Sequence, residues 1–291
     1  MGVTTVLLDD VLRDYYAPMR GLRERTIKLY EYTLRAWAEF LGRRPETSDL
    51  TEIALARFIQ HRVRTLSVQS AAKDRAQCRA IWQFCTERGL CTSWPSVPRL
   101  VVPERVPEAW LIDEMKALLA AAGSQPGVTA GFTMAAVFRA LLLLCYETGE
   151  RISAVLELKC ADVRGCNVIF RAEGRKGGRR DILREISVEC ADALMAVRRG
   201  PEDAAIPWDH HPTCVWRYLK KILKRAGLPT DRRSKFHRIR KTTASYYEAA
   251  CGSGSAQRLL DHASAKTTRA YLDPRIVQPG RPAPEVLPKV S

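Results

Sequence analysis

The sequence has no cysteine pair at the spacing of a zinc or redox motif, and it has no apolar segment long enough to cross a membrane. Its nine cysteines are an odd number without a Cys-x-x-Cys pair, so we expect reduced, buried thiols in a cytoplasmic protein. The longest apolar run, residues 134–146, is interrupted by Arg139 and is too short for a bilayer. The N-terminal MGVTTVLLDDVL has acidic residues where a secretory signal needs an apolar core, so we expect no signal peptide.

These features favour a protein without a metal, a cofactor, a membrane partner or a small-molecule substrate. What the sequence has in excess is positive charge: 47 Lys and Arg against 32 Asp and Glu, a net charge of +15. A chain this basic usually binds a polyanion, although a solvated basic surface has the same composition. The 291 residues and the hydrophobic share of 46% indicate two domains with packed cores.

Residues 1–94 are predicted to form a helical domain. One helix is indicated by apolar residues at three- and four-residue steps, with Thr26 as its N-cap and Gly42 as its stop. Further helices are predicted over residues 53–63 and through Cys78–Cys85. The opposite face of this last helix is basic and is either a contact for DNA phosphates or a solvated face: Lys73, Arg75 and Arg79.

Residues 95–109 are predicted to be a linker, because the segment PSVPRLVVPERVP holds four prolines. A second domain over residues 110–275 combines helices with one β-hairpin. The hairpin strands, residues 167–170 and 181–188, are joined by EGRKGGRR, which contains Lys176. The fold class is therefore mainly α with a small β-sheet (α+β), and residues 276–291 form a proline-rich tail.

Candidates for chemistry gather between Lys235 and Pro274. Tyr271 is the candidate nucleophile, for attack on a DNA phosphodiester. With a tyrosine pKa of about 10, roughly one phenol in a thousand is ionised at pH 7. A base must therefore take the proton, and His237 is the candidate.

The phosphodiester also needs cations on its non-bridging oxygens. Arg151 and Arg240 are the candidates, since guanidinium presents a fork of donors that matches two phosphate oxygens. His262 is a further hydrogen-bond donor to the phosphate, and Lys176 is the candidate that protonates the departing 5′ oxygen.

His-x-x-Arg alone is a weak motif, and the chain contains it twice. His61–Arg64 fits a polar helix face, whereas His237–Arg240 is followed by a glycine break and further motifs. The ordered motifs are TGERISAVLEL around Arg151, GRKGGRR, HRIR, LLDHASAKTT and AYLDP. Over residues 110–275 their order resembles that of the tyrosine recombinases, the family of phage integrases.

The resemblance implies a helical core-binding domain followed by a tyrosine-recombinase catalytic domain. It implies a catalytic set of Arg151, Lys176, His237, Arg240 and His262, with Tyr271 forming a 3′-phosphotyrosine bond without metal or ATP. Double-stranded DNA is the implied substrate and a homotetramer the implied assembly, in which residues 276–291 either dock on a neighbouring protomer or remain a tail. The sequence departs from the family pattern at Ala154, Lys241 and Asp261, which replace a glutamate, a histidine and a glycine.

The first hypothesis is thus a site-specific DNA recombinase or integrase. A type IB topoisomerase shares the chemistry without needing a specific site. A non-catalytic, sequence-specific DNA-binding protein would keep its DNA affinity after Tyr271→Phe and would form no covalent product.

Overall fold

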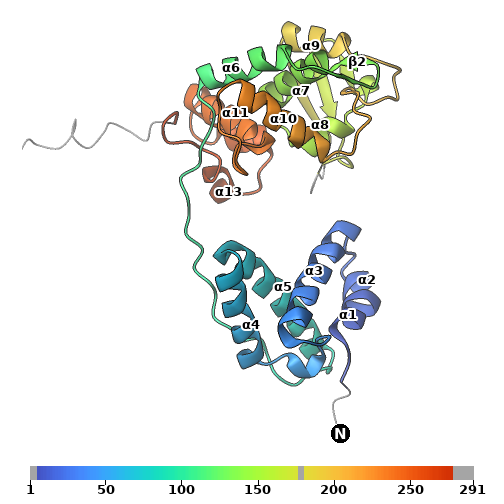
Figure 1. Cartoon of the computed structure of the whole chain (residues 1–291), viewed down its shortest axis with the longest axis vertical. Coiled ribbons are helices and arrows are strands. Elements are labelled where there is room, and N and C mark those ends of the chain that lie inside the picture. Colours follow the sequence, from blue (N-terminus) through green and yellow to red (C-terminus); the bar gives the residue numbers. More distant parts are fainter. Residues whose placement is uncertain (1–4, 176–179, 278–291) are drawn as a thin grey trace, which may run out of the picture. The chain divides into compact units, whose positions relative to one another are not determined.

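The computed structural model describes residues 5–175 and 180–277, and the chain divides into two compact units, Met1–Glu104 and Arg105–Ser291 (Figure 1). Lys176 lies outside the described residues. Helices dominate both units, and the two sheets have two and three short strands. The predicted fold class, mainly α with a small β-sheet, is confirmed. None of the helices in the described ranges is both long enough and apolar enough to cross a membrane.

The first unit is a bundle of helices joined by short connections. Its elements are α1 (Leu8–Asp10), the π-helical η1 (Val11–Tyr16), α2 (Ala17–Met19), α3 (Glu24–Leu41), the 3₁₀ turn η2 (Thr47–Asp49), α4 (Glu52–Thr65) and α5 (Val68–Glu87).

Helix α3 shows how the sequence pattern becomes a buried face. Trp37 is fully buried and stacks on Phe58 of α4, with ring centroids 5.6 Å apart. Gly42 ends the helix in the left-handed conformation with φ +71°, as predicted. The predicted N-cap was wrong: the cap is Arg23, whose carbonyl accepts hydrogen bonds from Thr26 and Ile27. The N-cap, Arg23, has an extended backbone and lies three residues before Thr26, so the helix begins at Glu24.

The predicted basic face of α5 is only partly available to a ligand. Lys73 pairs with the fully buried Asp74 at 2.9 Å. The guanidinium of Arg75 donates hydrogen bonds to the backbone carbonyls of Val97 and Pro98, so Arg75 tethers the start of the proline-rich segment to the first unit. Arg79 is exposed.

The second unit begins with α6 (Ile112–Gly123) and a small hairpin of β1 (Val128–Thr129) and β2 (Phe132–Thr133). Next come α7 (Met134–Thr148), α8 (Ile152–Glu157), the 3₁₀ turn η3 (Cys160–Asp162), β3 (Val163–Arg164), β4 (Asn167–Phe170) and β5 (Ile182–Glu185). The unit ends with α9 (Val188–Met195), α10 (Cys214–Arg225), α11 (Phe236–Cys251), α12 (Ser255–Leu260) and α13 (Ala265–Arg269).

Helix α7 is the centre of this unit, because it contacts α6, α8, α9 and α11. Such a helix must be apolar on every side, and ten of its residues are buried. It ends at Gly149, whose φ of +62° turns the chain directly into Glu150 and Arg151. A core helix thus delivers two charged residues to one place.

The predicted β-hairpin is confirmed. β4 pairs antiparallel with β5, with Phe170 opposite Ile182 and Asn167 opposite Glu185, and β3 adds a third strand beside β4. β5 ends before the predicted residue 188, because Ser187 is the N-cap of α9 and its hydroxyl accepts a hydrogen bond from the Cys190 N–H at 3.1 Å. The hairpin brings residues before and after the basic loop to one side of the unit.

Candidate functional site

Three short helical segments bring the candidate residues together. α11 carries His237 and Arg240. Gly252 and Gly254 follow it with φ of +84° and +81°, so the chain turns back and α12 packs on α11. His262 follows α12, and Tyr271 lies two residues beyond α13. The predicted glycine break therefore folds the candidates onto one another.

Tyr271 lies between two imidazole rings. Its ring centroid is 4.8 Å from that of His237, edge-on at 65°, and 4.8 Å from that of His262 at 59°. The guanidinium carbon of Arg240 is 5.7 Å from the same centroid. Three residues, the most distant 34 positions before Tyr271 in the sequence, thus surround one phenol.

The backbone around Tyr271 is held on both sides. The fully buried Ser245 of α11 donates a hydrogen bond to the Tyr271 carbonyl at 3.2 Å and accepts one from the Asp273 N–H at 2.9 Å. The Asp273 carboxylate, also fully buried, accepts from the Ala109 N–H at 2.7 Å and pairs with Arg275 at 2.7 Å. Tyr271 is therefore followed directly by a segment that is fixed to the protein core.

Arg240 is 2% exposed, and it is among the largest fully buried side chains of the protein. Its Nη1 donates to the Gly149 carbonyl at 2.5 Å, and its Nη2 donates to the Leu260 carbonyl at 3.0 Å. Burial first, and then the charge of Arg151, lowers the pKa of Arg240 to about 10, which leaves it a cation at neutral pH. Backbone carbonyls from two elements thus orient this cation.

His262 accepts from Arg240 and does not donate to it. Guanidinium has donors only, so the contact of 3.2 Å between Arg240 Nη2 and His262 Nε2 makes Nε2 an acceptor. The ring proton is then on Nδ1, which donates to Thr268 Oγ1 at 3.1 Å. Burial, together with the charges of Arg240 and Arg151, lowers the pKa of His262 to about 4. In this state His262 is neutral and orients Arg240.

His237 lies at the second position of α11 with one side open to solvent. Its pKa is lowered, first by the burial of its other side and then by the charges of Arg240, Lys241 and Arg151. The neutral ring is the form that accepts a proton, so the site favours the form that a general base needs.

Arg151 is the N-cap residue of α8 and is partly exposed. It contributes to the lowered pKa of Arg240, His237 and His262, so its charge acts on the same site. Within the described part of the chain, its guanidinium has no carboxylate partner. Five of the six predicted residues therefore share one site, and Lys176 cannot be placed because it lies outside the described residues.

A buried ionic network that no sequence motif indicated lies beside this site. Glu150 is 3% exposed and lies 3.3 Å from Arg175, 3.7 Å from Arg184 and 3.8 Å from Arg240. Arg175 also pairs with Asp261 at 3.3 Å. A carboxylate just after the glycine that ends a mostly apolar helix was the available signal for Glu150. The pairs join residues up to 90 positions apart in the sequence, so no local pattern marks them.

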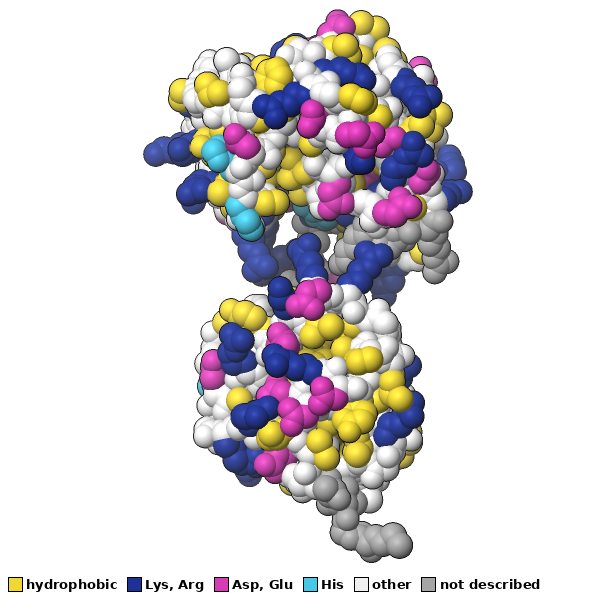
Figure 2. Space-filling view, turned by 90° about the vertical axis from the view of Figure 1, so that its right-hand side faces the viewer, with side chains coloured by type: hydrophobic (Ala, Val, Ile, Leu, Met, Phe, Trp, Pro, Cys, Tyr) yellow, Lys and Arg dark blue, Asp and Glu magenta, His cyan; other side chains and the backbone are white. Residues whose placement is uncertain are grey.

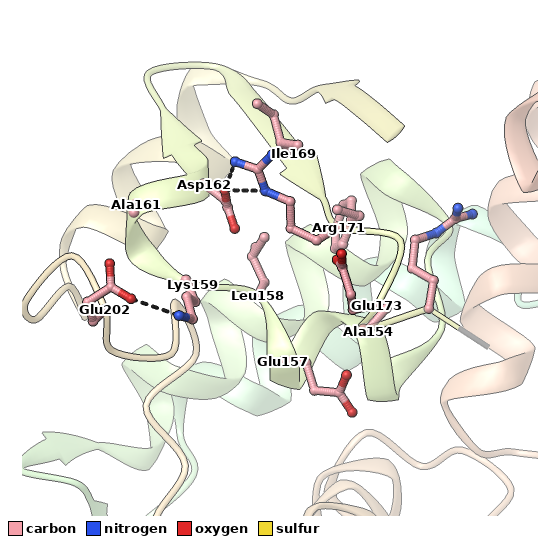
Figure 3. A pocket seen from close by; sticks show the side chains of 13 residues that line it. Ala154, Glu157, Leu158, Lys159, Ala161, Asp162, Ile169, Arg171, Glu173 and Glu202 are labelled. Atoms are coloured by element: carbon pink, nitrogen blue, oxygen red, sulfur yellow. Dashed lines mark hydrogen bonds and ion pairs between the residues drawn. The ribbon is translucent and has the colours of Figure 1, made fainter. Parts of the chain in front are cut away.

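A cavity of the second unit lies away from this site. It has a volume of about 560 Å³ and lies between α8, β4 and residues 171–175, with Ala154 and Glu157 on its wall (Figure 3). Its charged side chains pair with each other, Arg171 with Asp162 at 2.7 Å and Lys159 with Glu202 at 2.7 Å. Tyr271 and the residues around it do not line the cavity. Nothing in the cavity therefore replaces the tyrosine cluster as the candidate site.

Basic side chains cover the exposed side of α10. Val215, Leu219 and Leu223 are buried, whereas the opposite face is charged: Arg217, Lys220, Lys221, Lys224 and Arg225. Lys and Arg also lie on the visible face of each unit in Figure 2. Among the described residues there is no group of three or more His, Cys, Asp or Glu that could hold a metal ion. The site and its surroundings are thus shaped for an anion.

Two protein families match the chain. The family described as the phage integrase family matches residues 111–276, which is more than half of the chain. The phage integrase N-terminal SAM-like domain matches residues 12–89.

Known recombinases are similar over nearly the whole chain. Tyrosine recombinase XerD of Mycobacterium tuberculosis is 29% identical over 287 residues, which cover 89% of this chain and 90% of the relative. Tyrosine recombinase XerA of Pyrococcus furiosus is 24% identical, with 91% and 90% covered.

Solved structures share the fold. A lambda integrase dimer bound to a COC′ core site has a TM-score of 0.73 at 21% identity, covering 94% of this chain and 79% of that chain. A lambda integrase tetramer bound to a Holliday junction has the same TM-score and identity, with 96% and 80% covered. The XerH recombinase in a pre-cleavage complex with its difH substrate has a TM-score of 0.65 at 16% identity, with 90% and 81% covered.

Proposed function

The chain belongs to the phage integrase family of tyrosine recombinases, and we propose that it performs the reaction of that family with Tyr271 as its nucleophile. It is a site-specific recombinase, an enzyme that cleaves and rejoins DNA strands. The observation that carries the assignment of Tyr271 is its place between two imidazoles and a buried arginine.

In the proposed cleavage step, the Tyr271 hydroxyl oxygen attacks the phosphorus of a phosphodiester. The phenolic proton passes to neutral His237, a 3′-phosphotyrosine bond forms, and the bond from phosphorus to the 5′ oxygen breaks. The 5′ oxygen takes up a proton, for which Lys176 remains the candidate donor. Rejoining reverses these steps, so the energy of the broken bond stays in the intermediate.

Arg240 and Arg151 are proposed to bind the non-bridging oxygens. Charge on those oxygens grows in the transition state, and a fixed guanidinium stabilises it without a reorganisation cost. His262 is already fixed between Thr268 and Arg240. We propose that it keeps Arg240 in place and donates to the phosphate after a change of tautomer.

Double-stranded DNA is the proposed substrate, and a homotetramer is the proposed assembly. The net charge of +15 and the basic face of α10 support the first proposal. The lambda integrase tetramer bound to a Holliday junction supports the second by analogy. We propose that the chain acts in the cytoplasm, where DNA is accessible to a recombinase. In this proposal residues 1–94 clamp the DNA and residues 95–109 link the two domains. Residues 110–275 form the catalytic domain, and residues 276–291 form a tail.

The test uses nicked suicide substrates made from the DNA that flanks the gene of this protein. After incubation in EDTA, we expect a slow, protease-sensitive DNA band on a denaturing gel with the wild-type chain. Tyr271→Phe should abolish the band, whereas Tyr247→Phe should retain it, because Tyr247 is an exposed tyrosine of α11.

Salt-sensitive binding to the same DNA without any covalent band would contradict the proposal and favour a DNA-binding protein without catalysis. Relaxation of every supercoiled plasmid, without preference for a site, would instead favour a topoisomerase.

A further inference from the structure

Glu150 is a buried carboxylate surrounded by three guanidinium groups. Its side chain is 1% exposed, and the three groups lie 3.3–3.8 Å away, on Arg175, Arg184 and Arg240. Its Oε1 faces Arg175 and Arg184. Its Oε2 faces Nη1 of Arg240 at 3.8 Å and has no hydrogen-bond partner among the described residues. One carboxylate therefore serves three cations.

Arg240 depends on this carboxylate for charge compensation. Its hydrogen bonds go to two backbone carbonyls and to a neutral imidazole, none of which carries a negative charge. Within the described ranges, Glu150 is the one carboxylate paired with Arg240. A guanidinium that is 2% exposed would destabilise the folded protein if it had no counter-charge, because the desolvation cost of a buried ion is several kcal/mol.

Glu150 also connects Arg240 to the β4–β5 hairpin. Arg184 belongs to β5, and Arg175 lies in the connection between β4 and β5. Arg184 further donates to the Leu259 carbonyl in α12, the helix whose last residue, Leu260, accepts from Arg240. The carboxylate, just after α7, thus connects the hairpin and α11 through ion pairs.

We propose that Glu150 is a positioning residue for DNA cleavage, whose carboxylate fixes the guanidinium of Arg240 against the scissile phosphate and ties it to the hairpin. This proposal rests on the proposed function, because Arg240 acts on the phosphate only if the chain cleaves DNA. Without the carboxylate, Arg175, Arg184 and Arg240 lose the counter-charge that they share. Arg240 then moves away from its neighbours, and the geometry of its phosphate contact is lost.

The test compares Glu150→Gln with Glu150→Asp and with Glu157→Gln. Glutamine keeps the volume and removes the charge, aspartate keeps the charge on a shorter side chain, and Glu157 is an exposed glutamate on neighbouring α8 that controls for net charge. The rate of covalent complex formation is measured with the full chain saturating the nicked DNA, beside DNA affinity and thermal melting.

For Glu150→Gln we expect cleavage slower by about 10²-fold, the scale of a misplacement by about 1 Å, with unchanged DNA affinity. Glu150→Asp should recover part of the rate, and Glu157→Gln should match the wild type. A second substrate carries a neutral methylphosphonate at the scissile position, where there is less charge for Arg240 to stabilise. The deficit of Glu150→Gln should shrink on that substrate.

A rate for Glu150→Gln equal to that of the wild type would overturn the inference. So would an equal deficit on both substrates, which is the behaviour of a purely structural residue; if Glu150→Gln does not fold, the same comparison is made with Glu150→Asp. A wild-type chain that forms no Tyr271-dependent complex would instead overturn the proposed function, so the two failures are distinguishable.

Discussion

Asp261 makes two separable contributions to the stability of the second unit. It has φ +52° and ψ +46°, the left-handed conformation at the end of α12, where the family pattern has glycine. Its carboxylate pairs with Arg175 at 3.3 Å and with Arg180 at 3.2 Å. The backbone conformation is a cost, and the ion pairs offset it.

The solvent exposure of the paired side chains determines how much each ion pair contributes to stability. The pair with Arg180 contributes at most about 1 kcal/mol, because Arg180 is 76% exposed. Breaking a fully buried pair costs about 3–5 kcal/mol, but Asp261 is 28% exposed and Arg175 retains Glu150, so we expect less. Together the two pairs should contribute about 1–2 kcal/mol. A left-handed conformation costs an ordinary L-residue about 1 kcal/mol, and asparagine tolerates it well.

Three substitutions separate these contributions. Asp261→Asn removes the charge and keeps the backbone preference, so it should lose about 1–2 kcal/mol. Asp261→Ala should lose about 1 kcal/mol more, because alanine also disfavours the left-handed region. Asp261→Gly removes the charge and the backbone cost together, and its stability should lie near that of the asparagine variant.

Differential scanning calorimetry of the full chain is the appropriate assay, because the two units have separate cores. For a unit of this size, 1 kcal/mol corresponds to about 2–4 °C in Tm, so the asparagine variant should melt about 2–8 °C below the wild type. The transition of the first unit should not move, and it serves as an internal control. Equal melting of the wild type and Asp261→Asn would refute the role of the ion pairs. Equal melting of the alanine and asparagine variants would refute the backbone cost.

Three further predictions concern other parts of the molecule. Because the pKa values of His237 and His262 are lowered, both rings should stay neutral in an NMR titration of the DNA-free protein well below their ordinary pKa of about 6.5. The stability that the two neutral rings contribute is complete above that pH and falls as the pH drops toward the lowered pKa values. Protonation of either ring near pH 6.5 would contradict the site geometry. Arg75→Ala should speed limited proteolysis after Val97, since it releases the carbonyls that Arg75 binds, whereas the exposed Arg79 should tolerate alanine. Ser245→Ala should slow cleavage about tenfold without changing DNA affinity, because it frees the Tyr271 carbonyl and the Asp273 N–H; an unchanged rate would show that Asp273 alone suffices.

The sequence predicted the elements whose cause is local. The stop at Gly42 and the hairpin around the basic loop follow from backbone conformation and from strand periodicity within a few residues. The order of motifs likewise predicted that His237, Arg240, His262 and Tyr271 would act together, and the structure brings them together. The predicted start of α3 was wrong, because Thr26 lies inside the first turn but has the residue type of an N-cap.

The ionic network could not be predicted in this way. Glu150 and Arg240 are 90 positions apart in the sequence, and Arg175 and Asp261 are 86 apart. Pairing between them depends on how α7, the hairpin and α12 pack, which no periodicity encodes. Arg175 belongs to the basic run EGRKGGRR, yet its side chain is 3% exposed and bound to two carboxylates. Burial, rather than residue type, distinguishes it from the solvated arginines of the chain.

This network also explains the charge state of the site before DNA arrives. Glu150 is shared by three guanidiniums, and Arg151 has no carboxylate partner in the described residues, so the site keeps an excess of positive charge. That excess contributes to the lowered pKa of His237 and His262. A bound phosphodiester carries one negative charge and opposes the part of the shift that the arginines cause. The pKa of His237 then moves back toward the operating pH, where a general base is most effective. In the proposed mechanism, burial and the cations that would bind the phosphate keep His237 neutral in the free protein, and neutralisation of those cations by the substrate strengthens His237 as a base.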